Sequence, residues 1–277
     1  MKHSTRFARA PTAGIYGRAA MVTGGGSRGT GIGNGRAAAI LLARHGAHVA
    51  VLDNNAAWAD LTVDMIRGEG GEAIAIAADV TDNEGVHEAM GTVDATYGPL
   101  RILVNNVGIA GPAGTAEDLD LAAWETAMRA NVTSVVIASR HAIPRMRQAG
   151  GGSIVNITSV AGLIGGHPTL LYPASKGAVV NMTRAMAAHH GPDNIRVNCI
   201  APGLVHTPMV TTRGLTEEMR AARAHQGMLH TEGTGWDVGA AVTYLAGDTA
   251  RWITGIVLPV DAGLTAGLTR LQTPPRE

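Results

Sequence analysis

Residues 23–35 read TGGGSRGTGIGNG, and this glycine-rich stretch decides the fold. An apolar run precedes it at Ala19–Thr23, and a helical pattern follows it at about 35–45. Glycine permits tight turns and close backbone approach, while the free N–H groups and dipole of a helix N-terminus favour a phosphate. The stretch therefore predicts a strand, a phosphate-binding turn and a helix. Its candidate cofactor contacts are Gly24, Ser27, Arg28, Gly31, Ile32, Gly33 and Gly35.

The next predicted strand, His48–Asp53, ends in an acid. A carboxylate at that position can accept hydrogen bonds from a ribose 2′-OH, so it supports dinucleotide binding and adds Asp53 to the candidate contacts. The alternative interpretation is a flexible surface loop, with Asp53 as a strand cap.

Apolar strands alternate with helical patterns along most of the chain. Further strands are predicted at Glu72–Ala77, Leu100–Asn105, Ser153–Ser159, Ile195–Ala201 and Ile256–Val260. Further helices are predicted near 55–68, 82–96, 116–148, 172–190 and 236–247. Strands that are apolar on nearly every residue are typical of parallel sheets covered on both faces. The pattern predicts an α/β fold: one Rossmann-type domain with a doubly wound, parallel, seven-stranded sheet and helices on both faces.

We expect this domain to span residues 19–263, after a flexible N-terminal arm at 1–18 and before a C-terminal tail at 264–277. The segment near 203–234 interrupts the alternation and is a candidate substrate loop.

Composition excludes several function classes. The 22 basic and 22 acidic residues balance, so we expect neither nucleic acid nor a membrane surface as a partner. The single cysteine, Cys199, excludes an internal disulfide, and without a Cys/His cluster we expect no metal. No run of about 20 apolar residues or secretory signal is visible. The basic N-terminus could belong to an organellar transit peptide, but we expect a cytoplasmic protein.

Tyr172 and Lys176 form a candidate acid/base pair. Their i,i+4 spacing in a predicted helix puts both side chains on one face. A phenol titrates near pH 10 and is a poor base at neutral pH, but a nearby ammonium favours the phenolate. Lys176 is one of only two lysines among 22 basic residues, so an ammonium is a specific choice there. The alternative is a coincidence of two surface residues.

Other polar residues gather at the same edge of the predicted sheet. Ser159 ends a strand thirteen residues before Tyr172, and Asn105-Asn106 follow another strand. Asn131 lies in a helix expected to pack nearby. Ligands of doubly wound sheets bind outside the carboxyl ends of the strands, where these residues fall.

With these motifs the chain resembles the short-chain dehydrogenase/reductase family, in its shorter single-domain branch. The matching elements are 23–35, Asp79-Val80, 105–108, Asn131, Ser159, Tyr172 with Lys176, Pro202-Gly203, Thr207-Pro208 and 252–255. The resemblance covers about residues 19–263. It implies an NAD(P)-dependent oxidoreductase that acts on an alcohol/carbonyl pair, usually as a homotetramer.

The resemblance also implies residue roles. Tyr172 would be the general acid/base, Lys176 would lower its pKa and hold the nicotinamide ribose, Ser159 would bind the substrate oxygen, and Asn131 would position a relay water. The implied cofactor contacts are Asp79 and Val80 at the adenine, Asn106 and Gly108, Val205 and Thr207 at the carboxamide, and Tyr172 and Lys176 themselves.

The chain departs from the family pattern TGxxxGxG in one major respect: about five extra residues separate Thr23-Gly24 from Arg36-Ala37. Counting back from Gly46 makes Gly35 the helix-opening glycine, whereas Gly31-Ile32-Gly33 looks more like the usual signature. Val107 also replaces the usual alanine.

The main hypothesis is hydride transfer between NAD(H) and a secondary alcohol/ketone pair. Asp53 favours NAD because it should repel a 2′-phosphate, although Arg28 lies in a Ser-Arg-Gly string like that of NADP-using relatives. One alternative is an NADPH-dependent 3-oxoacyl thioester reductase, and another is a non-catalytic dinucleotide-binding regulator. His167 and His206 flank the site and could contact a small-molecule alcohol or ketone.

Overall fold

The computed structural model describes residues 13–211 and 214–267. Their main sheet is entirely parallel, with seven strands in the order β3-β2-β1-β4-β5-β6-β9. The strands are β1 (Ala19–Thr23), β2 (His48–Asp53), β3 (Glu72–Ala77), β4 (Ile102–Asn105), β5 (Gly152–Ile157), β6 (Ile195–Pro202) and β9 (Val257–Val260). The predicted doubly wound α/β fold is confirmed.

The strand order reverses between β1 and β4, which pair directly. Chain segments leaving these two strands therefore diverge to opposite sides of the sheet, and the crevice between them is where such folds bind ligands. The glycine-rich loop follows β1 and Asn106 follows β4, so both border this crevice.

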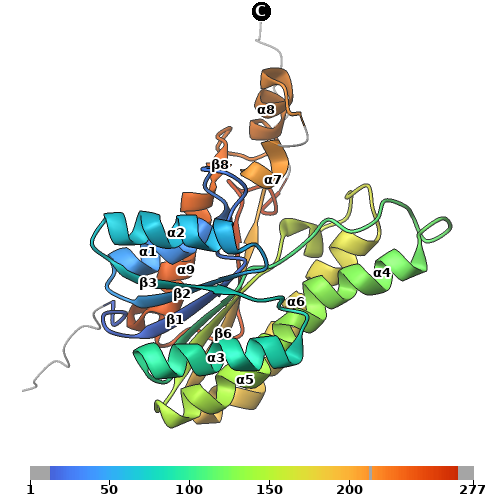
Figure 1. Cartoon of the computed structure of the whole chain (residues 1–277). Coiled ribbons are helices and arrows are strands. Elements are labelled where there is room, and N and C mark those ends of the chain that lie inside the picture. Colours follow the sequence, from blue (N-terminus) through green and yellow to red (C-terminus); the bar gives the residue numbers. More distant parts are fainter. Residues whose placement is uncertain (1–12, 212–213, 268–277) are drawn as a thin grey trace, which may run out of the picture.

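Helices cover both faces of the sheet (Figure 1). One face carries α1 (Asn34–Arg44), α2 (Ala56–Gly68) and α9 (Gly235–Ala246). The other carries α3 (Asn83–Tyr97), α5 (Ser134–Gln148) and α6 (Leu171–His190). Two apolar clusters fill the layers, because β1, β2 and β4 alternate side chains between the two faces. Val22 and Val104 face the first set of helices, whereas Met21 and Leu103 face the second.

The predicted helix over 116–148 is wrong as one element. Residues 116–120 precede α4 (Leu121–Met128), a π-helical turn follows at Arg129–Thr133, and α5 begins at Ser134. A π-helical turn is rare and is common at functional sites, and this one contains Asn131.

The flexible arm expected over 1–18 needs a correction for residues 13–18. Ile15 is 1% exposed and belongs to the core, and Arg18 forms an ion pair of 2.7 Å with Asp248. Residues 1–12 lie outside the described part of the chain. In the tail, residues 264–267 continue a turn bonded to Asp261, and residues 268–277 again lie outside.

The segment near 203–234 has structure of its own. It contains β7 (Val205–His206), α7 (Pro208–Thr211), α8 (Glu217–Ala224) and β8 (Gly233–Thr234), with β7 and β8 paired in parallel. Figure 1 shows α7 and α8 projecting from the sheet edge where the carboxyl ends of the strands lie. Residues 203–234 are called the substrate segment below, after the role that the sequence predicts for them. Among the described helices, none is long and apolar enough to span a membrane.

Candidate active site

The two ends of the glycine-rich loop, at Gly24 and Gly35, are in contact directly after β1. Gly24 has a φ of +61°, which favours glycine, and a Cβ atom on Gly35 would overlap the Gly24 carbonyl oxygen. The Asn106 amide donates to this carbonyl at 2.8 Å and to that of Thr23 at 3.3 Å. Asn106 thus fastens the start of the loop across the β1–β4 crevice.

Helix α1 begins at Asn34, with Gly33 as an N-cap that offers no side-chain acceptor. The first turn contains no acidic residue, so its N–H groups and positive dipole end are left for an anion. The Gly31-Ile32-Gly33 triplet leads into the helix, and Gly35 is the glycine that packs against Gly24. These features fit a dinucleotide pyrophosphate.

The lengthened part of the loop is fastened by Arg36, which is fully buried. Its guanidinium donates to the backbone carbonyls of Ser27, Gly29 and Gly31 at 2.7–3.0 Å. Burial lowers the pKa of Arg36, and the Asp53 charge opposes that effect. Ile32 packs against the core beside α1.

Asp53 lies beneath the same loop and is 8% exposed. One carboxylate oxygen accepts from the Gly26 N–H at 3.1 Å and the other from the Asn55 N–H at 3.0 Å. These bonds fix a negative charge at the end of β2. Arg28 is exposed, and its guanidinium carbon lies 5.9 Å from the centre of the Trp58 ring.

The predicted adenine contacts follow β3. Asp79 is exposed and accepts from the N–H and hydroxyl of Thr81, both at 2.8 Å. Val80 is 6% exposed and packs in the core with α3. Of the pair, Asp79 is therefore the one that presents a polar group to solvent.

Lys176 is the buried cation of the site. It is 3% exposed, and its ammonium donates to the Ile157 carbonyl at the end of β5, at 3.1 Å. Burial lowers the pKa of Lys176 to about 8. A Cβ atom on Gly108 would lie 2.8 Å from the Lys176 Nζ, so only glycine leaves this space beside the ammonium.

Tyr172 and Lys176 share a face of α6, with Nζ 5.8 Å from the centre of the tyrosine ring. The His167 ring packs against the Tyr172 ring. The two ring centres are 5.2 Å apart, and the angle between the ring planes is 30°. Ser159 is partly exposed and caps the short 3₁₀ turn Val160–Gly162, accepting from the Ala161 N–H at 3.2 Å. The backbone of this turn packs on α6 at Gly162, against Lys176 and Gly177.

Asn131 is fully buried in the π-helical turn. Its amide exchanges hydrogen bonds with the Ile109 backbone, at 2.8 and 2.9 Å, and donates to the Ser175 hydroxyl at 3.0 Å. Asn131 therefore ties the 108–109 loop to α6 at the residue before Lys176.

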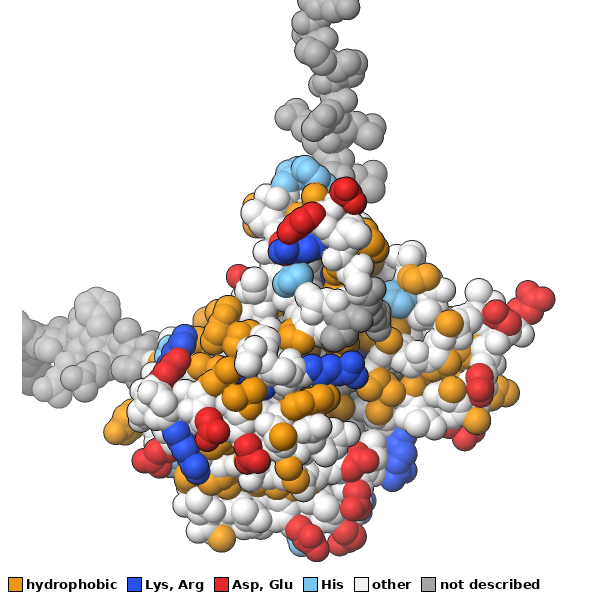
Figure 2. Space-filling model, turned by 45° about the horizontal axis from the view of Figure 1, so that its top comes forward, with side chains coloured by type: hydrophobic (Ala, Val, Ile, Leu, Met, Phe, Trp, Pro, Cys, Tyr) orange, Lys and Arg blue, Asp and Glu red, His pale blue; other side chains and the backbone are white. Residues whose placement is uncertain are grey.

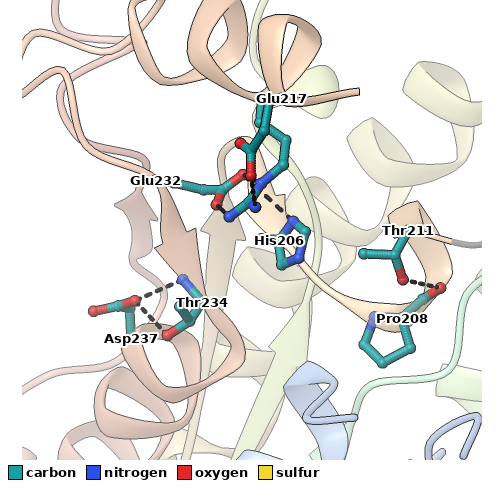
Figure 3. Close-up of polar contacts among 8 residues, drawn as sticks. His206, Pro208, Thr211, Glu217, Glu232, Thr234 and Asp237 are labelled. Atoms are coloured by element: carbon teal, nitrogen blue, oxygen red, sulfur yellow. Dashed lines mark hydrogen bonds and ion pairs between the residues drawn. The ribbon is translucent and has the colours of Figure 1, made fainter. Parts of the chain in front are cut away.

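The substrate segment is braced by charged residues (Figure 3). The two oxygens of Glu232 accept from Arg220 of α8 at 2.5 and 3.3 Å, which lowers the pKa of Glu232. The His206 Nδ1 lies 3.4 Å from Glu232 Oε1. Val205 is buried in β7, and the Thr207 carbonyl accepts from Val210 and Thr211 at the start of α7. His206 therefore faces the Arg220–Glu232 ion pair.

Two polar residues near the site were not predicted from the sequence. Arg36 lies in the first turn of an otherwise alanine-rich, buried helix, and this charge was the available signal for a buried cation with internal partners. Ser175 precedes Lys176 and bonds Asn131 across 44 residues, and no local pattern marked that contact.

Comparisons with known proteins agree with this architecture. A family model described as enoyl-(acyl carrier protein) reductase matches residues 27–265. Cis-4-hydroxycyclohexanecarboxylate dehydrogenase of Sinomonas cyclohexanicum is 38% identical over 249 residues, covering 90% of this chain and 97% of that protein. Cyclohexanol dehydrogenase of Acinetobacter sp. strain SE19 is 34% identical, with coverages of 90% and 95%.

The structure also aligns with 7α-hydroxysteroid dehydrogenase complexed with NADH and 7-oxo-glycochenodeoxycholic acid. The TM-score is 0.86 at 32% identity, and the alignment covers 96% of this chain and 100% of the other. The fold, the site and these similarities lead to one assignment: the chain belongs to the short-chain dehydrogenase/reductase family.

Proposed function

We propose that this protein is an NAD-dependent dehydrogenase that interconverts a secondary alcohol and a ketone, with Tyr172 as general acid/base. The observation that carries the proposal is the buried Lys176 ammonium, 5.8 Å from the centre of the Tyr172 ring. Family membership supports a nicotinamide dinucleotide and chemistry at a CH–OH group. The Lys176 charge would stabilise the phenolate that removes the alcohol proton.

The neighbouring side chains support the same chemistry. The Ser159 hydroxyl would donate to the substrate oxygen, and Asn131 would hold the 108–109 loop beside Lys176 and position the relay water. Bound NAD would accept the hydride from the carbinol carbon. In the reduction direction Tyr172 would return the proton to the ketone oxygen.

Preference for NAD over NADP rests on Asp53. Its buried carboxylate is fixed by two N–H groups, so a 2′-phosphate would meet a negative charge that cannot turn away. The remaining proposed cofactor contacts are Gly24, Ser27, Arg28, Gly31–Gly33, Gly35, Asp79, Val80, Asn106, Gly108, Val205 and Thr207.

A second candidate, NADPH-dependent reduction of a 3-oxoacyl thioester, is favoured by one observation. Arg28 belongs to the loop that covers Asp53, and its guanidinium lies near Trp58. From there it could pair with a 2′-phosphate. On the face shown in Figure 2, basic and acidic side chains are interspersed, which gives less support to docking of an acidic carrier protein.

The substrate class is proposed from apolar residues on the loops that lead to the site. Ile109, Ile164 and Leu170 are exposed large side chains, at 43%, 43% and 40%. They belong to the loop bonded to Asn131 and the loop before Tyr172, and such side chains suit a hydrophobic substrate. Several relatives are named for six-membered-ring alcohols, so we propose a cyclic secondary alcohol.

The test is a panel of cyclic and open-chain secondary alcohols and their ketones with NAD(H) and NADP(H), followed by nicotinamide absorbance. We expect turnover with NAD and a ring alcohol. A preference for NADPH with an acyl thioester would instead support the second candidate. Dinucleotide binding without turnover of any alcohol or ketone would favour a regulator.

We also propose a cytoplasmic homotetramer, with subunits meeting along α4–α5 and α6 and near β9. Exposed Leu121, Val136 and Trp252, at 72%, 50% and 92%, lie in or next to these elements and support the proposal. Light scattering at micromolar concentration should give the mass of four chains, and a monomer would contradict it.

A further inference from the structure

The lengthened glycine loop is folded around a single buried cation. Arg36 is fully buried, and all five of its N–H donors have acceptors. The acceptors are the Thr62 hydroxyl at 2.9 Å, the Gly29 and Gly31 carbonyls at 2.8 and 2.7 Å, the Ser27 carbonyl at 3.0 Å and the Trp58 carbonyl at 3.4 Å. A buried charge is costly unless it is fully hydrogen-bonded, so this cation strongly favours one loop conformation.

The carbonyls that Arg36 binds in the loop belong to every second residue, Ser27, Gly29 and Gly31, and this alternation orients the loop backbone. In a trans peptide the C=O and the following N–H point in opposite directions. Because the carbonyls of Ser27, Gly29 and Gly31 point to Arg36, the N–H groups of Arg28, Thr30 and Ile32 point away from it. These N–H groups have no acceptor within the described residues. Such outward N–H groups suit an anion, and the guanidinium charge behind them adds to the attraction.

The same loop contacts the substrate segment. A Cβ atom on Gly31 would overlap the ring of Pro208, the first residue of α7. A Cβ atom on Gly235, at the start of α9, would lie 2.9 Å from the carbonyl oxygens of Ile32 and Gly33. The loop is therefore packed between α7 and α9, so its conformation affects the elements on both sides.

We propose that Arg36 is a positioning residue for the dinucleotide. It holds the lengthened loop so that the outward N–H groups bind the cofactor phosphates, and it keeps the loop seated against Pro208. The inference rests on the proposed cofactor chemistry but concerns residues that sequence comparison with the usual TGxxxGxG loop does not explain.

The test compares Arg36→Lys with a matched control, Arg196→Lys. Lysine keeps the charge but loses the planar fork. Arg196 is partly buried, and like Arg36 its guanidinium donates to backbone carbonyls, those of Leu245, Ala246, Gly247 and Ile253. Its contacts involve the end of α9 and Ile253 in the segment before β9, not the glycine loop. NADH binding is measured by fluorescence titration and dissociation by stopped flow, both without substrate, and thermal unfolding of the free protein is followed in parallel.

Arg36→Lys should raise the Kd for NADH at least tenfold through faster dissociation, with kcat at saturating NAD changed by less than threefold. Arg196→Lys should lower the unfolding temperature while leaving the Kd within twofold of wild type. The inference is wrong if both variants keep the wild-type Kd, or if both raise it equally, because the loss would then reflect general destabilisation. Failure of wild type to bind NADH at all would instead overturn the proposed function.

A double-mutant cycle adds a second readout. In a variant lacking residues 27–31, Arg36 has lost the three loop carbonyls, so Arg36→Lys should change the NADH Kd by less than twofold. An unchanged tenfold effect in that background would show that Arg36 acts independently of the loop and would overturn the inference. If the shortened protein does not fold, Gly29→Pro, which restricts the loop backbone near the guanidinium, replaces it and should reproduce the tenfold loss.

Discussion

Gly35 lies so close to Gly24 that a Cβ atom on Gly35 would overlap the Gly24 carbonyl oxygen and lie 2.5 Å from the Asn106 amide nitrogen. The two glycines flank the lengthened loop, eleven positions apart in the chain. Their contact brings the start of the loop and the first turn of α1 together whatever the length of the segment between them. The crowding atoms belong to backbone and to a hydrogen-bonded amide, so they cannot easily move aside.

Gly35→Ala should therefore destabilise the protein and weaken NADH binding by at least tenfold. Gly91→Ala is the control, because Gly91 is also helical and a Cβ there meets nothing within 4 Å. That change should stabilise by about 0.5–1 kcal/mol through the greater helix propensity of alanine. Chemical denaturation and NADH titration measure both effects. Equal stability changes in the two variants would contradict the close-contact interpretation.

Tyr172→Phe removes the proposed proton-transfer group and keeps the ring that packs beside His167. We expect kcat to fall by about 10²–10⁴, while the Kd for NADH and the unfolding temperature stay near wild type. Tyr244→Phe, at a half-exposed position of α9, should leave kcat unchanged. Near-normal turnover in Tyr172→Phe would contradict the assignment of Tyr172 as general acid/base.

The sheet was predictable because its strands are short apolar runs separated by segments with helical periodicity. Both patterns are local in the sequence. The π-helical turn at Asn131 was not, since the Asn131 amide in this turn donates hydrogen bonds to Ile109 and Ser175, which are distant in the chain. Arg36 was missed for the same reason: its partners in α2 are folded over it from 22 and 26 residues away. Tyr172 and Lys176 could be paired from sequence because four residues of helix fix their relation.

Asp53→Asn should narrow the preference for NAD over NADP. The change keeps the size of the side chain and removes the negative charge held by the Gly26 and Asn55 N–H groups. We expect the ratio of kcat/KM for NAD to that for NADP to fall at least tenfold, mainly because NADP is no longer repelled. Asp60→Asn on the exposed side of α2 is the matched control. If the wild type already prefers NADP, Arg28 rather than Asp53 governs the choice.

The lowered pKa of Lys176 predicts a specific pH dependence of stability. Burial lowers this pKa from 10.5 to about 8 in the folded protein. Between these pH values the unfolded chain holds a proton on this lysine that the folded protein has released, so the free energy of unfolding should rise with pH across that interval. Below about pH 8 the lysine is protonated in both states and contributes no slope.

The comparison uses Lys176→Met, which keeps an unbranched apolar chain and cannot titrate. The difference in unfolding free energy, wild type minus variant, should rise by about 3 kcal/mol between pH 7.5 and 10.5, because one pKa unit corresponds to about 1.4 kcal/mol. Groups with shifted pKa values that do not contact Lys176, such as Cys199, titrate in both proteins and cancel in the difference. Urea denaturation of the cofactor-free proteins at several pH values measures it. Parallel curves for the two proteins would show that Lys176 titrates near its ordinary pKa, and a difference that falls with pH would mean that the folded site instead stabilises the ammonium.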